Sequence, residues 1–151
     1  MRSLLLLVSL SLMLVAPLQA DDGQFTDIHG NVISLSELRG KWVVVNYWAS
    51  WCPPCLDELP ELEAFHQNHR EDTAVVIGIN VEQELTREEL ADFVAGLSLS
   101  FPIIRLQEGL PGFGPVPGLP TTFLIDPQGE IAARQVGAVS AAMIEGFMAR
   151  Y

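Results

Sequence analysis

Two mostly apolar runs stand out in the first half of the chain, at 42–47 and 73–80. Short runs rich in valine and isoleucine are typical of parallel strands that are buried on both faces. Between them, apolar residues recur at helical spacing over 56–70, which predicts an amphipathic helix with Pro60 inside it. This half of the chain therefore predicts a strand–helix–strand unit with a right-handed connection.

Turn and capping residues mark the other elements. Gly30 and Asn31 tolerate positive φ and separate two short segments with strand character, which predicts a hairpin. Thr86 and Glu89 fit a capping box at the start of a helix. The further elements expected are hairpin strands at 25–28 and 32–35, a helix from 86 to about 96, an extended piece at 100–106, strands at 121–125 and 130–136, and a last helix from 140 to 150.

The segment 109–120 differs from the rest in composition, with four glycines and four prolines. We expect no regular structure there. The order of the other elements predicts one α/β domain with a central mixed β-sheet. Its first two core strands should be parallel and its last two an antiparallel hairpin. We expect helices on both faces of this sheet, with the N-terminal β-hairpin as an extension.

Residues 1–20 have the features of a secretory signal. A basic residue precedes an apolar run at 4–16, which is too short for a comfortable membrane span. Cleavage after Ala20 would leave a single domain over 21–151 in the periplasm, or otherwise exported. Leu18 is a poor residue three positions before such a cut, so an uncleaved anchor formed by 4–16 stays open.

The charge of the chain is strongly acidic. It has 19 aspartate and glutamate residues against 8 lysine and arginine residues, and a formal net charge of −11. Contacts to phosphates need clustered basic side chains, so we expect no nucleic-acid partner. An acidic surface favours solubility.

The chain has two cysteines, Cys52 and Cys55, placed where the first buried strand ends and a helix begins. A disulfide between them would close a tiny loop and stabilise the fold little, so the pair indicates chemistry. Backbone N–H groups and the helix dipole stabilise a thiolate at a helix start. We therefore predict that Cys52 attacks disulfides and that the more buried Cys55 resolves the mixed disulfide.

A zinc site is the structural alternative, because His66 and His69 follow the cysteines. The spacing between the histidines is short of the usual zinc-finger pattern, so we expect no metal. Both histidines should be solvated late in the helix. No cofactor is expected beyond a redox-active Cys52–Cys55 disulfide.

The motif WCPPC at 51–55, together with LPTTFLID at 119–126, resembles the thioredoxin-like superfamily. More narrowly, it is similar to the exported thiol-disulfide oxidoreductases of the TlpA/ResA type. The resemblance covers the chain from about Phe25 to its C-terminus. It implies the thioredoxin fold and a thiol-disulfide oxidoreductase enzyme.

The resemblance also implies roles for residues outside the cysteine pair. Pro120 corresponds to the family's cis-proline beside the dithiol, and with Leu119 and Thr121 it would offer backbone to an extended client. Glu58 stands where the reductive branch carries an acid that tunes the thiols or carries protons. The alternative for Glu58 is an ordinary acidic residue of an early helix turn.

Three further residues complete the expected site. Trp51 and Pro53 should belong to the substrate surface. Asn46 is a departure from thioredoxin, which has a buried aspartate six residues before the first cysteine, so a base at this position is excluded. Any base that assists Cys55 must then be Glu58 or water.

The leading interpretation is an exported protein-disulfide reductase, which we expect to be a monomer. Its clients would be proteins such as apocytochrome c, and a membrane thiol protein would supply electrons. Pro53 and Pro54 have no N–H to solvate a thiolate, which favours a reducing or intermediate potential. Four alternatives stay open: an oxidase, an isomerase, a peroxide-reducing relative, and a thioredoxin-fold binding or chaperone module.

Overall fold

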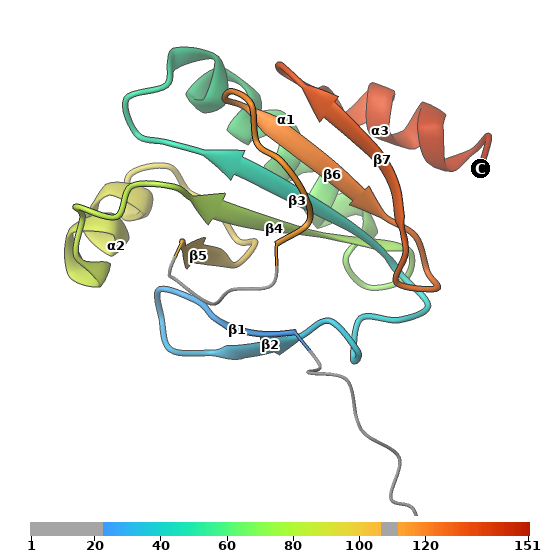
Figure 1. Cartoon of the computed structure of the whole chain (residues 1–151), viewed down its shortest axis with the longest axis horizontal. Helices are drawn as coiled ribbons and strands as arrows, with labels where there is room; N and C mark the ends of the chain where they lie inside the picture. The colour runs from blue at the N-terminus through green and yellow to red at the C-terminus, as the bar shows by residue number, and fades with distance from the viewer. Residues whose placement is uncertain (1–22, 107–111) are drawn as a thin grey trace, which may run out of the picture.

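A five-stranded mixed sheet and three helices form the fold, with a separate two-stranded hairpin at the N-terminal end (Figure 1). This computed structural model describes residues 23–106 and 112–151. The predicted signal 1–20 lies outside the described residues, as does the part of the Gly/Pro segment at 109–111. None of the described helices has the length and apolar character needed to cross a membrane.

The elements agree with the predicted ones to within a few residues. The strands are β1 (Gln24–Thr26), β2 (Val32–Ser34), β3 (Trp42–Trp48), β4 (Ala74–Asn80), β5 (Ile103–Arg105), β6 (Thr121–Ile125) and β7 (Ile131–Val136), and the helices are α1 (Pro53–His69), α2 (Arg87–Ala95) and α3 (Ala141–Met148). Thr86 forms the predicted capping box with Glu89, and Ser140 caps α3.

The sheet has the order β5-β4-β3-β6-β7. β3 lies at its centre with all seven residues buried, between parallel β4 and antiparallel β6. β6 and β7 form the antiparallel hairpin, and β5 extends the parallel half beyond β4. The prediction of a mixed sheet in a thioredoxin fold is therefore confirmed.

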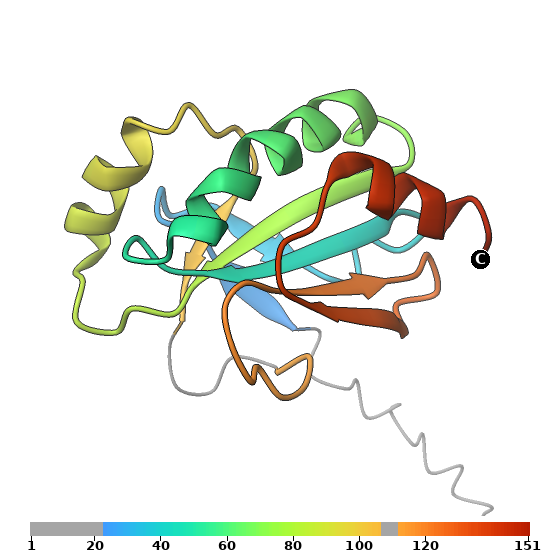
Figure 2. The same cartoon turned by 90° about the horizontal axis from the view of Figure 1, so that it is seen from above.

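The expectation of helices on both faces is wrong, because all three helices lie on one face (Figure 2). Their buried residues belong to one apolar cluster, in which Leu62 of α1, Leu90 of α2 and Ile144 of α3 share the same side of the sheet. The connections β3-α1-β4 and β4-α2-β5 advance in the same direction across the sheet. Two right-handed crossovers in one direction place their helices on the same face.

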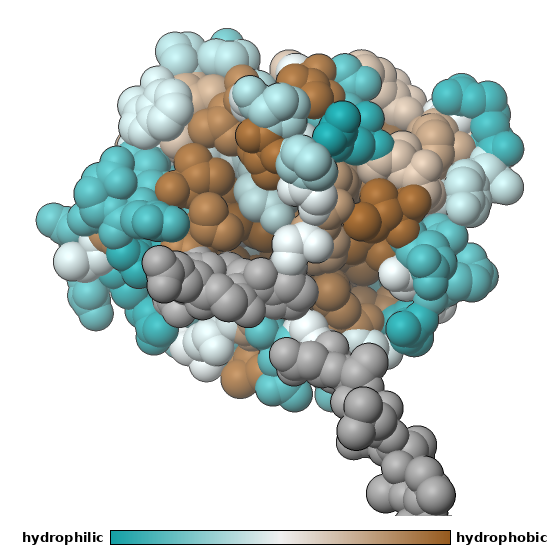
Figure 3. Space-filling model, viewed as in Figure 1, coloured by the Kyte–Doolittle hydropathy of each residue, from teal (hydrophilic) through white to brown (hydrophobic). Residues whose placement is uncertain are grey.

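The opposite face is covered by the β1–β2 hairpin and the Gly/Pro segment. Phe25 of β1 stacks on Phe113 with ring centroids 6.0 Å apart, and both join a second apolar cluster with Val45 and Ile79 of the sheet. The hairpin is thus part of the core packing. On the face seen in Figure 3, hydrophilic side chains gather over α2, whereas hydrophobic ones spread over the middle.

Candidate redox site

The two cysteines lie at the predicted junction between β3 and α1. Cys52 is the N-cap of α1 in an extended conformation, and Pro53 and Pro54 occupy the first two helical positions. The sulfurs of Cys52 and Cys55 are joined in a disulfide of 2.10 Å, and the two Cα atoms are 5.3 Å apart. The site is therefore described in its oxidised form.

Both cysteines are buried, and the surface above them is formed by their neighbours. Cys52 is 4% exposed and Cys55 is 0% exposed, whereas Trp51 is 65% exposed and Pro53 is also exposed. The expected order of exposure is confirmed, because Cys55 is more deeply buried than Cys52. Trp51 and Pro53 lie where a docking client could contact them.

Few backbone donors are available around the Cys52 sulfur. Pro53 and Pro54 have no N–H. The next two N–H groups, of Cys55 and Leu56, both donate to the carbonyl oxygen of Cys52, at 3.0 and 3.1 Å. The backbone N–H groups of the first turn of α1 are therefore already bonded to a carbonyl oxygen, which leaves fewer donors for a Cys52 thiolate.

The segment before β6 carries the other predicted substrate contacts. The Leu119–Pro120 peptide bond is cis and Pro120 is buried, while Leu119 is half-buried against the apolar cluster that contains both cysteines. Thr121 is fully buried, and its hydroxyl donates to the carbonyl of Gly118 at 2.6 Å. The hydroxyl of Thr121 is thus committed to the turn, so a contact of Thr121 with a client would have to use its backbone.

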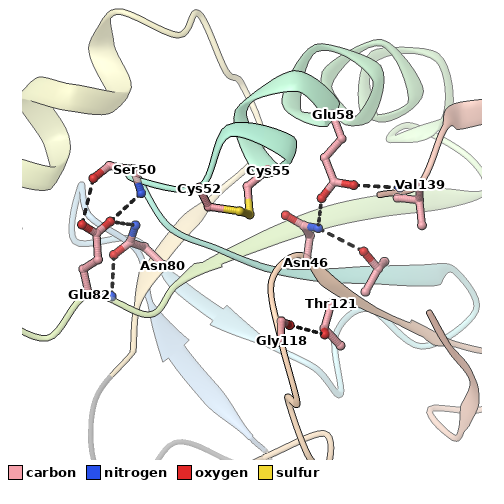
Figure 4. The surroundings of a disulfide bond; sticks show 11 residues. Asn46, Ser50, Cys52, Cys55, Glu58, Asn80, Glu82, Gly118, Thr121 and Val139 are labelled. Atoms are coloured by element: carbon pink, nitrogen blue, oxygen red, sulfur yellow. Dashed lines mark hydrogen bonds between the residues drawn. A yellow bond between two sulfur atoms is a disulfide. The ribbon is translucent and has the colours of Figure 1, made fainter. Parts of the chain in front are cut away.

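Glu58 points from α1 toward β3, on the same side of the helix as Cys55 (Figure 4). It is 3% exposed, so it is no solvated helix-start residue. Its Oε1 accepts a hydrogen bond from Asn46 Nδ2 at 2.6 Å, and its Oε2 accepts one from the Val139 backbone N–H at 2.8 Å. Burial raises the pKa of Glu58 above its ordinary value, because these two hydrogen bonds offset only part of the lost hydration.

Asn46 connects Glu58 to β6. It is fully buried, and its Nδ2 also donates to the hydroxyl of Thr122 at 3.0 Å. Its Oδ1 is buried without a hydrogen-bond partner among the described residues. The amide thus fixes the Glu58 carboxyl while it cannot itself take a proton, as the sequence predicted.

A second buried carboxyl, Glu82, was not predicted from the sequence. It lies on the other side of the disulfide, at the turn that leads into α1 (Figure 4). Glu82 Oε2 accepts the backbone N–H of Ser50 at 2.6 Å and Asn80 Nδ2 at 2.9 Å, and Oε1 accepts the Ser50 hydroxyl at 2.8 Å. The sequence did contain a signal for Glu82, because polar residues follow β4 directly. The carboxyl ends of adjacent parallel strands meet at one edge of a sheet, so a residue after β4 lies near the turn that follows β3.

The pKa of Glu82 is shifted in the opposite direction from that of Glu58. Burial pushes the pKa of Glu82 upward, but the hydrogen bonds from the Ser50 N–H, the Asn80 amide and the Ser50 hydroxyl outweigh it. The pKa of Glu82 therefore lies below its ordinary value, and this carboxyl is ionised at neutral pH.

The histidines considered as zinc ligands point elsewhere. His66 is buried, and its Nδ1 accepts the backbone N–H of Val76 at 3.1 Å, so the expectation of a solvated His66 is wrong. His69 is bonded to Glu145 at 3.0 Å. Within 23–106 and 112–151, no three histidine, cysteine, aspartate or glutamate side chains are grouped as metal ligands.

Comparisons with known proteins agree with this site. A model of the AhpC/TSA family matches residues 18–134. The chain is 39% identical over 134 residues to the thiol-disulfide oxidoreductase ResA of Halalkalibacterium halodurans, a match that covers 86% of this chain and 73% of that protein. The structure is similar to StoA from Bacillus subtilis, with a TM-score of 0.69, 29% identity, and coverage of 83% of this chain and 94% of that one.

A secreted thiol-disulfide isomerase from Corynebacterium glutamicum is also similar, with a TM-score of 0.71, 28% identity, and coverage of 83% of this chain and 80% of that one. The thioredoxin-like resemblance is thereby confirmed over most of the chain. With a Cys52–Cys55 disulfide at the start of α1, the chain belongs to the AhpC/TSA family and is a thiol-disulfide oxidoreductase of the ResA type.

Proposed function

We propose that this protein reduces disulfides in exported protein clients. The observation that carries the proposal is the arrangement around the Cys52–Cys55 pair: few donors near the first sulfur, and a buried carboxyl of raised pKa, Glu58, behind the second. The first feature disfavours a strongly stabilised thiolate, and the second supplies a carboxyl group that keeps its proton to higher pH than an ordinary glutamate.

The reaction has two exchange steps. The Cys52 thiolate attacks one sulfur of the client disulfide, forms a mixed disulfide, and releases the other client sulfur as a thiolate. The Cys55 thiolate then attacks the Cys52 sulfur, which restores the Cys52–Cys55 disulfide and releases the second client thiol. The client gains two electrons and two protons, and the protein loses them.

Glu58 acts in the second step. Cys55 must lose its proton before it attacks, and it is fully buried in the oxidised form. Asn46 has no proton-accepting role, so the Glu58 carboxylate takes the proton from Cys55. Its raised pKa suits this role, because a base works best when its pKa is near the operating pH.

The client docks on the surface beside the disulfide. Trp51 and Pro53 supply exposed apolar area, and Leu119, which precedes the cis-proline Pro120, packs against the apolar cluster that contains both cysteines. An extended client segment that pairs with this backbone would bring its disulfide to Cys52.

The proposal includes export through the signal at 1–20 and a membrane thiol protein as electron source, since a reductase in an oxidising compartment needs imported electrons. One solved relative is a secreted enzyme, which is in line with export. Apocytochrome c is a candidate client, and we propose that the protein acts as a monomer.

The deciding experiment is the reduction potential of the Cys52–Cys55 pair, measured on a chain without residues 1–20 in glutathione or dithiothreitol buffers. A value near about −270 mV supports a reductase, whereas a value near about −120 mV would show a disulfide donor. Cys55→Ala tests the assigned roles, because it should trap clients on Cys52 as mixed disulfides. If no trapped species appears on non-reducing gels, Cys52 is not the attacking thiol.

A further inference from the structure

The proposed exchange steps make no use of Glu82, although this carboxylate is built into the site. Glu82 is 5% exposed and accepts three hydrogen bonds, two of them from Ser50. Ser50 lies in the four-residue turn between β3 and α1 that ends at Cys52. Within this turn, one further backbone bond links the Cys52 N–H to Ala49 at 3.2 Å.

Glu82 is itself held in place from two directions. Its backbone N–H donates to Asn80 Oδ1 at 3.0 Å, and Asn80 is fully buried at the end of β4. The guanidinium of Arg105, at the end of β5, donates to the carbonyls of Gln83 and Leu85 in the loop that follows Glu82. These bonds attach the Glu82 carboxylate to the ends of β4 and β5. Through Ser50, the carboxylate in turn fixes the turn between β3 and α1 to the sheet.

The charge of Glu82 has no cationic partner within 23–106 and 112–151. The two ion pairs found there join His69 to Glu145 and Arg70 to Glu71. A buried carboxylate without a cation costs free energy that hydrogen bonds must offset. Three donors aimed at it, two of them from the residue two positions before Cys52, point to a role at the redox pair.

We propose that Glu82 is a positioning residue of the thiol–disulfide exchange: through Ser50 it holds the turn that carries Trp51 and Cys52, and it keeps a negative charge near the attacking sulfur. The proposal rests on the assignment of Cys52 as the attacking thiol. Cys52→Ser tests that assignment separately, because it should abolish client reduction whatever Glu82 does.

The positioning matters most when the disulfide is open. Reduction removes the covalent link that ties Cys52 to Cys55 in α1. The Ser50–Glu82 hydrogen bonds do not depend on that link, so they hold the turn during the attack on a client. In-line exchange requires a defined direction of approach, and small misplacements of a reacting atom cost large factors in rate.

The test uses the chain without residues 1–20 and four variants. Glu82→Ala removes the three acceptor contacts. Glu82→Gln keeps the shape and the Ser50 N–H acceptor but removes the charge, and Ser50→Ala removes only the hydroxyl donor. Glu84→Gln is the matched control, because Glu84 is an exposed residue of the same loop and its change alters the net charge equally.

Two readouts separate positioning from simple stability. Glu82→Ala should lower the second-order rate of client reduction about tenfold or more, measured at a temperature where the variant is folded. Glu82→Gln should keep most of that rate and move the pH profile of Cys52 alkylation to lower pH, because a nearby negative charge raises a thiol pKa. Ser50→Ala should give a smaller loss of rate, and Glu84→Gln should match the original protein.

The proposal is overturned if Glu82→Gln leaves the alkylation profile where Glu84→Gln leaves it and Ser50→Ala reduces clients at the original rate. Those two variants decide the matter even if Glu82→Ala does not fold. A loss of client reduction in Cys52→Ser with these results would leave the proposed function standing and remove only the role of Glu82.

Discussion

Two glutamates flank the disulfide, and they are buried to nearly the same extent: Glu58 is 3% exposed and Glu82 is 5% exposed. Their pKa values nevertheless shift in opposite directions. Glu58 accepts two hydrogen bonds, and Glu82 accepts three. The sign of each shift follows from a balance: the protein surrounds Glu58 more deeply and gives it fewer donors, whereas Glu82 has less protein around it and more donors aimed at it.

The difference divides two tasks between the two sides of the site. On the α1 side, Glu58 can change its protonation as Cys55 changes state. On the β4 side, Glu82 stays ionised and fixes the turn before Cys52. Pairs of acids whose environments separate their pKa values commonly take separate roles in one reaction.

The largest effect expected is on stability, from Glu82→Leu. The substitution leaves the Ser50 N–H, the Ser50 hydroxyl and the Asn80 amide without an acceptor, which should lower the free energy of unfolding by about 2–4 kcal/mol. Glu58→Leu should cost less, because Asn46 keeps its bond to Thr122. Urea unfolding of the oxidised proteins measures both, and equal losses would contradict the difference in donor number.

Glu58→Gln should slow the second exchange step. Without a carboxylate to take the Cys55 proton, the breakdown of a mixed disulfide on Cys52 should slow about tenfold or more at neutral pH. Rapid-quench analysis of a model mixed disulfide measures this rate. Asp57→Asn is the matched control, since Asp57 is the exposed neighbour on the same helix. An equal effect of both changes would remove Glu58 from the reaction.

The two glutamates should also give opposite pH dependences of stability. The folded pKa of Glu82 lies below its ordinary value of 4.5, so its contribution is present above pH 4.5 and is lost as the pH falls through the folded pKa. The folded pKa of Glu58 lies above 4.5, so its contribution is present below pH 4.5 and is lost as the pH rises through the folded pKa.

Unfolding experiments from about pH 4 to about pH 8 test this contrast. Relative to the original protein, Glu82→Gln should become less destabilising toward acid pH, and Glu58→Gln should become less destabilising toward neutral pH. Two parallel trends would show that both carboxyl groups titrate in the same environment.

The smallest effect concerns His66, whose own titration must be separated from that of the glutamates. Burial lowers its pKa below the ordinary 6.5, so its contribution to stability is present above pH 6.5 and is lost as the pH falls through the folded pKa. His66→Asn keeps an acceptor for the Val76 N–H and should flatten this part of the profile. An unchanged profile would mean that the pKa of His66 is the same in the folded and unfolded protein, which would contradict the effect of burial.

Much of the fold could be predicted because its signals are local. The apolar runs of β3 and β4, the capping box at Thr86 and the turn around Gly30 each depend on a few neighbouring residues. The distribution of helices over the two faces could not be predicted this way. It depends on the order of strands in the sheet, which pairs β4 with β5 on the side away from β3.

The site divides in the same way. The dithiol, the position of Cys52 at the start of α1 and the proline that precedes β6 follow from the residue pattern, because motif and element boundaries coincide there. The inward turn of Glu58 to Asn46 and the contact of Glu82 with Ser50 arise only when the chain folds. Those contacts join residues 12 and 32 positions apart, and the pKa of each carboxyl follows from the burial and the donors that other elements of the fold supply.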